Sequence, residues 1–211
     1  MARIQKLDAS LLDEAAQHLG RVDARLAGVI AAHGPCTLAP RGDPYRYLVR
    51  SILYQQLAGK AAATIERRFK AGFGGRVPAP PVLAVQRDAK LRRFGLSRQK
   101  AAAVKAVAAA FAAGEVNARR LPHLTDAAIV ESVTQIRGVG EWTAHMLLMF
   151  SLGRPDVLPV GDYGVRKGAQ KLYGLGDLPK PEALAKIAEP WRPFRTVGSW
   201  YLWRALEVEV E

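Results

Sequence analysis

Two glycines, Gly138 and Gly140, enclose one apolar residue, Val139, between two segments that both show helical periodicity. Glycine tolerates positive φ and close backbone approach, so the pattern predicts a tight turn between two helices, with Val139 inserted between them. The amides of the turn and of the next helical turn, up to Thr143, are expected to be exposed and unpaired, which suits a phosphate oxygen. On this pattern alone, an ordinary turn between helices is an equal alternative.

The carboxylate Asp162 stands 22 residues after Gly140 and directly before an expected helix over Tyr163–Tyr173. A carboxylate at this place can cap the helix by accepting hydrogen bonds from backbone amides. It can also stabilise a positive charge that develops during a reaction and orient a water molecule. On the residues alone capping is the favoured interpretation, and the two roles can coexist.

Four segments of the chain occur together in an order that is typical of one protein family. They are the run 48–57 followed by 60–62, the hairpin 138–144, the loop 158–167 with its carboxylate, and the aromatic-rich run 191–204. Together they resemble the helix-hairpin-helix superfamily of DNA glycosylases, and within it the AlkA-type DNA-3-methyladenine glycosylase II branch. The resemblance covers roughly residues 45–204.

This resemblance implies a monofunctional DNA glycosylase of base excision repair. Such an enzyme flips an alkylated purine, 3-methyladenine or 7-methylguanine, out of duplex DNA and hydrolyses its N-glycosidic bond, which leaves an abasic site. Asp162 would stabilise the oxocarbenium-like sugar. One alternative is a glycosylase of the same fold that acts on uracil or an oxidised base. The other is a non-catalytic DNA-binding helical module that uses only the hairpin.

An alkylated purine is cationic, and aromatic faces attract a cation by about 0.5–2 kcal/mol. The resemblance implies a base pocket with three main aromatic residues and two weaker candidates: Trp142, Tyr163 and Trp203, then Tyr54 and Met146. The alternative for the aromatic residues is packing in the core.

A flipped nucleotide leaves a gap in the duplex that a wedge side chain fills. Gln56, expected at the end of its helix, fits this role best, and Leu57 is the alternative. The competing interpretations are a surface position for Gln56 and a core position for Leu57.

The expected reaction type follows from residue 142. In the bifunctional branch of the family a lysine stands two residues past the second hairpin glycine, where this chain has Trp142, and no Lys or Arg occurs between Arg137 and Arg154. We therefore expect hydrolysis by water without AP lyase activity. The single Cys36 cannot form an iron–sulfur cluster. The resemblance alone implies a sodium or potassium ion on the backbone of Ile136 and Val139, and no other cofactor.

Apolar residues recur at helical spacing in nearly every segment, and strand-like alternation is almost absent. This predicts an all-α protein. The family fold implies two helical domains with the active site in the cleft between them: a central domain at 45–150 with the hairpin, and a second domain at 1–44 plus 151–211 with the carboxylate. Two of the expected helices cover Tyr45–Leu57 and Glu141–Leu152.

The formal net charge is +12, and its distribution is uneven. Residues 1–105 contain 19 basic and 7 acidic residues, residues 106–211 contain 12 of each, and the stripe 60–105 contains 12 basic and 2 acidic residues. A confined basic stripe is typical of a nucleic-acid binder, although a solvated helical surface is an equal alternative. We expect a monomer that binds duplex DNA with alkylated bases.

The start of the chain is charged throughout and lacks the apolar core of a signal peptide. The longest uncharged apolar stretch, Trp142–Gly153, is shorter than the roughly 20 residues that cross a bilayer. The sequence therefore predicts a cytoplasmic, nucleoid-associated protein without membrane contact.

Overall fold

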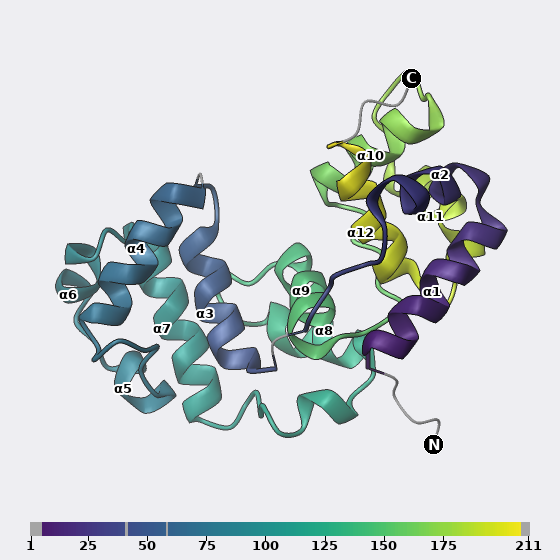
Figure 1. The fold of residues 1–211 in the computed structure, drawn as a ribbon. Coiled ribbons are helices and arrows are strands. Elements are labelled where there is room, and N and C mark those ends of the chain that lie inside the picture. The colour runs from purple at the N-terminus through teal and green to yellow at the C-terminus, as the bar shows by residue number, and fades with distance from the viewer. Residues whose placement is uncertain (1–5, 41, 58, 208–211) are drawn as a thin grey trace. The chain divides into compact units, whose positions relative to one another are not determined.

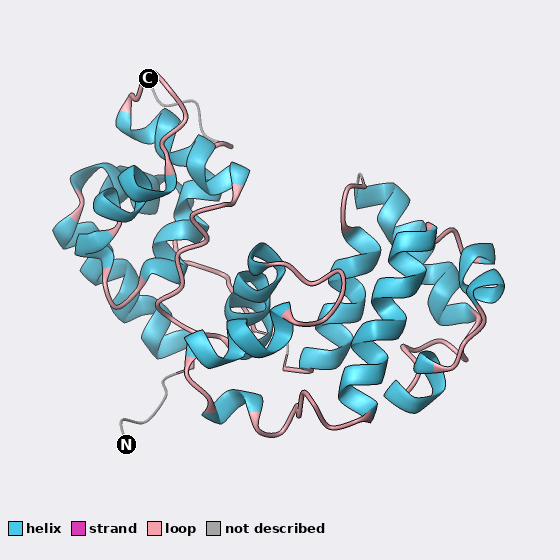
Figure 2. Cartoon of the chain, turned by 180° about the vertical axis from the view of Figure 1, so that it is seen from behind, coloured by secondary structure: helices cyan, strands magenta, loops and turns pink. Residues whose placement is uncertain are grey.

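The computed structural model describes residues 6–40, 42–57 and 59–207. Every regular element among these residues is a helix, which confirms the expected all-α class (Figure 2). The chain divides into two compact units, one of residues 42–147 and one of residues 1–41 with 148–211. The domain boundaries expected from the sequence fall three residues further along the chain at both places.

The unit 42–147 is built around two long helices that pack side by side (Figure 1). Its helices are α3 (Pro44–Tyr54), α4 (Gly59–Ala71), α5 (Pro80–Ala84), α6 (Asp88–Arg93), α7 (Arg98–Ala112), α8 (Asp126–Thr134) and α9 (Glu141–Leu147), with a 3-10 turn at Leu121–His123. The central pair is α3 and α7. Helix α4 packs on α3, α6 packs on α7, and α9 contacts both α3 and α8.

Helix α7 is the axis of this unit because its sequence favours both a helix and close packing. Alanine has the highest helix propensity, and Ser97 caps the N-terminus by accepting a hydrogen bond from the Lys100 amide. The small side chains of Ala101, Ala103 and Ala108 are buried, which lets neighbouring backbones approach closely.

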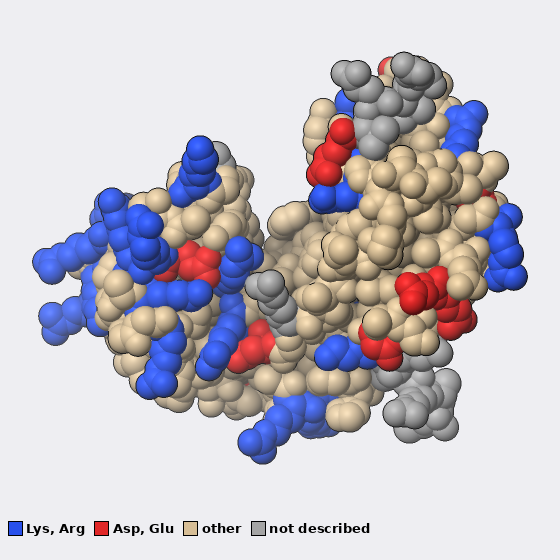
Figure 3. Space-filling view, in the orientation of Figure 1, with Lys and Arg blue, Asp and Glu red and all other residues tan. Residues whose placement is uncertain are grey.

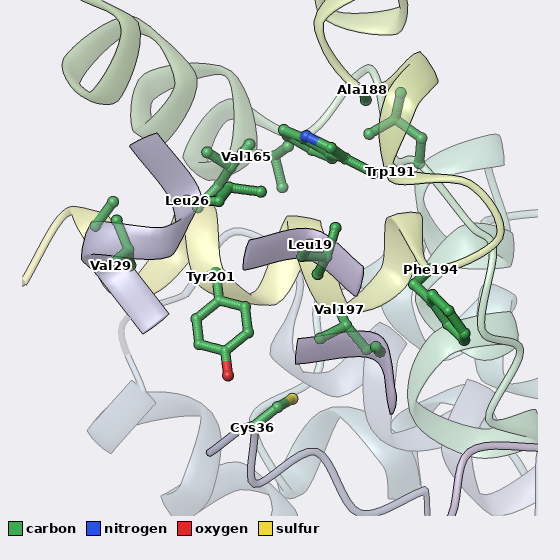
Figure 4. Packing of buried hydrophobic residues seen from close by; sticks show 14 of the residues in the cluster. Leu19, Leu26, Val29, Cys36, Val165, Ala188, Trp191, Phe194, Val197 and Tyr201 are labelled. Carbon is green, nitrogen blue, oxygen red and sulfur yellow. The ribbon is translucent and has the colours of Figure 1, made fainter. Parts of the chain in front are cut away.

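The second unit contains α1 (Ala9–Val22), α2 (Ala24–His33), a π-helical turn η2 (Leu148–Leu152), α10 (Tyr163–Tyr173), α11 (Pro181–Ile187), a 3-10 turn η3 (Glu189–Trp191) and α12 (Arg195–Ala205). Helix α12 packs against α1, α2 and α10. Trp191 and Tyr201 are the largest fully buried side chains, and they lie with Leu19, Leu26 and Val197 in one apolar cluster (Figure 4). Burial of each such side chain stabilises the unit by about 1.5–3 kcal/mol.

The expected helix over Tyr45–Leu57 is wrong at its C-terminus. Helix α3 ends at Tyr54, and Gln56 adopts a φ of 54°, in the left-handed region that a continuing helix cannot use. The Lys100 ammonium donates a 2.8 Å hydrogen bond to the Leu53 carbonyl, which satisfies one of the last carbonyls of the helix.

The expected single helix over Glu141–Leu152 is also wrong. The α-helix ends at Leu147, and the next five residues, Leu148–Leu152, form the π-helical turn. An uninterrupted apolar run has no periodicity that distinguishes the two helix types. π-Helical turns are rare and occur frequently at functional sites.

Candidate functional site

The hairpin between α8 and α9 requires glycine at its first position. Gly138 has a φ of 88°, and a Cβ atom built there would lie 2.4 Å from the Cβ of Ala103 on α7. The turn is therefore locked on α7 by a contact that admits no side chain. Gly140 has no atom within 4 Å of a built Cβ, so its place in the turn does not depend on packing.

The expectation that the turn amides are unpaired is wrong at Val139. Its side chain is buried, and its amide donates a 3.0 Å hydrogen bond to the Ile136 carbonyl. The hydrogen-bond ladder of α9 begins with the Ala144 amide, which donates to the Gly140 carbonyl. Gly140 itself is exposed, whereas Thr143 is buried. The exposed part of the hairpin thus includes both glycines, Gly138 and Gly140, and the start of α9.

The turn that follows α3 is tied to the hairpin by a side chain that the sequence did not single out. The Gln55 side-chain amide donates a 3.1 Å hydrogen bond to the Gly138 carbonyl. The two wedge candidates that follow, Gln56 and Leu57, are both exposed, and 39% of Leu57 is accessible. The competing core position for Leu57 is therefore wrong. No periodicity could reveal Gln55, because its partner lies 83 residues further along the chain.

Two hydrogen bonds reach the Oδ1 atom of the Asp162 carboxylate. Its Oδ1 accepts the Val165 amide at 2.7 Å, which caps α10, and it also accepts the indole Nε1–H of Trp203 at 2.9 Å. The capping interpretation of Asp162 is confirmed, and its catalytic role stays a prediction. Both bonds fix the carboxylate in one orientation. A group that stabilises a developing charge electrostatically must be held in this way.

Trp203 brings α12 against the start of α10, and an aromatic residue supports it. A Cβ atom built at Gly164 would lie 2.8 Å from Cδ1 of Trp203, so the indole reaches Asp162 only because residue 164 has no side chain. The Phe150 ring on the π-helical turn stacks on Trp203, with ring centroids 5.8 Å apart and an angle of 25° between the planes. Phe150 was missed from the sequence because it is one apolar residue in an apolar run.

The structure groups the base-pocket candidates by unit. Tyr163, which is 67% exposed, and the half-buried Trp203 belong to the same unit as Asp162. Trp142, Tyr54 and Met146 belong to the unit 42–147. Of these, Trp142 is 45% exposed, whereas Met146 is buried.

Tyr54 is engaged in a polar cluster of its own. Its hydroxyl donates a 2.7 Å hydrogen bond to Glu66, and the Arg50 guanidinium lies 4.0 Å above its ring. The hydrogen bond to Glu66 raises the pKa of Tyr54, because it stabilises the protonated hydroxyl. Lys70 also pairs with Glu66, at 2.7 Å. The polar end of Tyr54 is thus occupied within its own unit.

The described residues hold no group of three or more His, Cys, Asp or Glu side chains that could bind a metal. Cys36 is a buried free cysteine, and burial raises the pKa of its thiol to about 11. The Ile136 carbonyl, one of the two expected ligands of a monovalent cation, accepts the Val139 amide and keeps its second lone pair. Neutral backbone oxygens of this kind suit a hard cation.

Comparison with protein families gives a match to the HhH-GPD superfamily base excision DNA repair proteins over residues 49–193. The chain belongs to this superfamily. The match includes the hairpin, Asp162 and the π-helical turn that carries Phe150. The identity of the family confirms the resemblance that the four segments indicated.

Individual relatives of this HhH-GPD protein are similar over most of their length. DNA-3-methyladenine glycosylase 1 of Schizosaccharomyces pombe is 34% identical, and the match covers 92% of this chain and 87% of the relative. The structure of the S. pombe 3-methyladenine DNA glycosylase in complex with abasic DNA superposes with a TM-score of 0.84 at 32% identity, covering 92% of this chain and 97% of that one. A Bacillus halodurans DNA-3-methyladenine glycosidase gives a TM-score of 0.81 at 36% identity, covering 90% and 88%.

Within the described part of this HhH-GPD protein, no helix has the length and apolar character that spanning a bilayer requires.

Proposed function

We propose that the protein is a monofunctional DNA glycosylase of base excision repair that removes 3-methyladenine and 7-methylguanine from duplex DNA. One observation carries this proposal: Asp162, at the expected catalytic position of an HhH-GPD protein, accepts hydrogen bonds from the Trp203 indole and the Val165 amide. Its relatives in S. pombe and B. halodurans bear the names of DNA-3-methyladenine glycosylases or glycosidases.

Cleavage of the N-glycosidic bond of an alkylated purine requires a fixed negative charge near the sugar more than it requires a proton donor. Cleavage of the bond between the sugar C1′ and the base leaves positive charge on the sugar, and the bonding electron pair leaves with the base. An N-alkylated purine is already cationic and therefore departs as a neutral molecule without protonation. The Asp162 carboxylate stabilises the sugar cation and orients the water, whose oxygen bonds to C1′ while one of its protons passes to the solvent.

The proposed pocket uses aromatic faces. Tyr163 is exposed next to Asp162 in the chain, and Trp203 is fixed against the carboxylate by its Nε1–H. A cationic base gains roughly 0.5–2 kcal/mol over such faces, and a neutral purine gains less. This difference favours alkylated purines over undamaged ones.

Hydrolysis without strand cleavage is the proposed outcome. The residue two positions beyond Gly140 is Trp142, and the segment between Arg137 and Arg154 contains no amine that could attack the sugar. A Schiff base, which precedes strand cleavage in bifunctional enzymes, then has no nucleophile in this segment. The product is an intact strand with an abasic site.

Contact with duplex DNA is proposed at two places in the unit 42–147. The exposed Gly140 and the start of α9 receive a phosphate, to which a sodium or potassium ion on the backbone of Ile136 and Val139 would add positive charge. The exposed turn with Gln56 and Leu57 fills the gap left by the flipped nucleotide. A monomer is sufficient for these contacts.

The experiment is base release from a duplex that carries 3-methyladenine or 7-methylguanine, measured by chromatography of the free base. The expected product is free methylated base together with a strand that breaks only after alkaline treatment. Release of uracil or 8-oxoguanine in place of the methylated purines would refute the substrate class. Strand breaks before alkaline treatment, with a borohydride-trapped covalent adduct, would refute the monofunctional reaction.

A further inference from the structure

The basic stripe 60–105 separates into two kinds of side chain. Three of its twelve basic residues are half-buried, and each of these donates a hydrogen bond. Lys70 bonds Glu66, Lys100 bonds the Leu53 carbonyl, and Lys105 bonds Asp88, all within 2.8 Å. The other nine basic residues are exposed. The half-buried lysines are therefore engaged in contacts within their own unit, and the exposed residues need another explanation.

The stripe contains too few carboxylates to neutralise the exposed residues. Glu66 and Asp88 are its only acidic residues. Glu66 already accepts hydrogen bonds from Tyr54 and Lys70 and pairs with Arg50, and Asp88 pairs with Lys105. Uncompensated like charges on one surface repel each other and lower the stability of the folded chain unless an anion binds there.

Six of the exposed residues form what we call the basic surface: Arg67, Arg68, Arg76, Lys90, Arg92 and Arg93. They lie on α4, on α6 and in the chain between these helices. The space-filling view shows Lys and Arg side chains gathered over this part of the unit 42–147 (Figure 3). Within that unit, α3 and α7 separate α4 and α6 from α8 and α9, so the basic surface is distinct from the hairpin (Figure 1).

An aromatic cluster gives the basic surface a rigid base. Phe69 on α4 and Phe73 just after it pack on Phe94, which follows α6, with ring centroids 6.1 and 5.8 Å from that of Phe94. The Phe69 and Phe73 centroids lie 5.1 Å apart. Gly72 allows this contact, because a Cβ atom there would lie 2.2 Å from Phe94. The Lys90 ammonium lies 4.4 Å above the Phe73 ring. Charges on a rigid base lose less side-chain and backbone entropy when they bind a ligand.

We propose that the basic surface is a second, sequence-independent binding site for the phosphate backbone of undamaged duplex DNA. This inference rests on the proposed function, which makes DNA the partner. It assigns DNA binding to a further surface that has no part in base removal. Five of its six residues are arginines, whose planar guanidinium donates two parallel hydrogen bonds to a phosphate. Such a site would hold the protein on DNA between lesions and raise the rate of encounter.

The test replaces three residues of the basic surface, Arg68→Gln, Arg76→Gln and Arg93→Gln, in the full chain. Binding to an undamaged fluorescent duplex is measured by anisotropy across a series of salt concentrations. Each lost phosphate contact removes about 0.9 from the slope of log Kobs against log salt, so we expect a decrease of roughly 2–3 and an affinity at least about 10-fold lower. The matched control removes the same charge from exposed residues of the other unit: Arg21→Gln, Lys180→Gln and Lys186→Gln.

Two further measurements decide the interpretation. The triple Arg→Lys variant at positions 68, 76 and 93 should keep most of the salt slope, because the charges remain. The single-turnover rate of base release at saturating enzyme should not change in the Gln variant, because the surface does not touch the lesion. An unchanged salt slope in the Gln variant, or an equal decrease in the control, overturns the inference and leaves the proposed function intact. Failure of the wild type to release methylated purines overturns the proposed function instead.

Discussion

Substitution of Asp162 separates its role in the fold from its proposed role in the reaction. Asp162→Asn keeps an Oδ1 that can accept the Val165 amide and the Trp203 indole, so the free energy of unfolding should change by less than about 1 kcal/mol. Asp162→Ala removes the cap, worth about 1 kcal/mol, and leaves the indole N–H unpaired, at a further cost of about 1–3 kcal/mol. The sum of about 2–4 kcal/mol corresponds to a Tm lower by roughly 4–16 °C.

The two variants should nevertheless lose the same amount of activity. A unit negative charge about 4 Å from a developing cation, at an effective dielectric constant of about 20, is worth about 4 kcal/mol. Removal of that charge lowers the single-turnover rate of base release about 1000-fold, because each 1.36 kcal/mol is a factor of ten. Asp162→Asn should therefore be as stable as the wild type and almost inactive, and it should still bind duplex DNA.

The assay combines thermal unfolding with single-turnover release of methylated purine at saturating enzyme. Trp203→Phe is the companion variant, which keeps an aromatic ring and loses the hydrogen bond to Asp162. It should lower the rate by at least about tenfold, because one lost bond to a charged group is worth about 1.5–3 kcal/mol. Release by Asp162→Asn within tenfold of the wild-type rate would refute the electrostatic role of the carboxylate. An equal loss of Tm in the Asn and Ala variants would refute the assignment of the two hydrogen bonds.

Three other predictions follow from contacts and burial within the individual units. Gly138→Ala should lower the free energy of unfolding by about 1–3 kcal/mol, because its Cβ would meet Ala103 and its φ is positive. Gly140→Ala has open space around its Cβ and should lower the free energy of unfolding by less than about 1 kcal/mol. Urea unfolding measures both. Gln55→Leu removes the hydrogen bond to the Gly138 carbonyl and should weaken binding to abasic-site DNA several-fold with an unchanged Tm. Recovery of DNA binding by the shorter Gln55→Asn would contradict the need for a side chain long enough to reach the hairpin. Cys36, with a pKa of about 11, should resist iodoacetamide at pH 8 in the folded chain and react after denaturation, and rapid labelling of the native protein would contradict its burial.

The parts of the site that the sequence predicted correctly depend on local rules. An Asp directly before an apolar helix predicts an N-cap, and Asp162 is one. Glycine at a turn predicts positive φ, and Gly138 has it. The all-helical class follows from the spacing of apolar residues along the whole chain. Each of these inferences depends only on residues that are close to one another in the sequence.

The parts that the sequence could not predict depend on contacts between distant segments or on small differences between helix types. The bond between Gln55 and the hairpin joins residues 83 positions apart, and the bond between Asp162 and Trp203 joins residues 41 positions apart. The π-helical turn that presents Phe150 has the same apolar composition as the α-helix before it. Periodicity does not carry this information, because tertiary packing decides it.

The charges of the two units match two opposite demands of the proposed substrate. Damaged DNA is a polyanion that carries a cationic base, so residues that attract its phosphates would repel the lesion and the sugar cation. The unit 42–147 contains 17 basic and 7 acidic residues, whereas the unit that holds Asp162 contains 14 basic and 12 acidic residues. Because Coulomb energy depends on the local balance of charge, a nearly neutral unit leaves the carboxylate and the aromatic faces as the dominant groups near the cation. The division lets substitutions on the basic surface change the affinity for DNA without altering the contacts that hold Asp162.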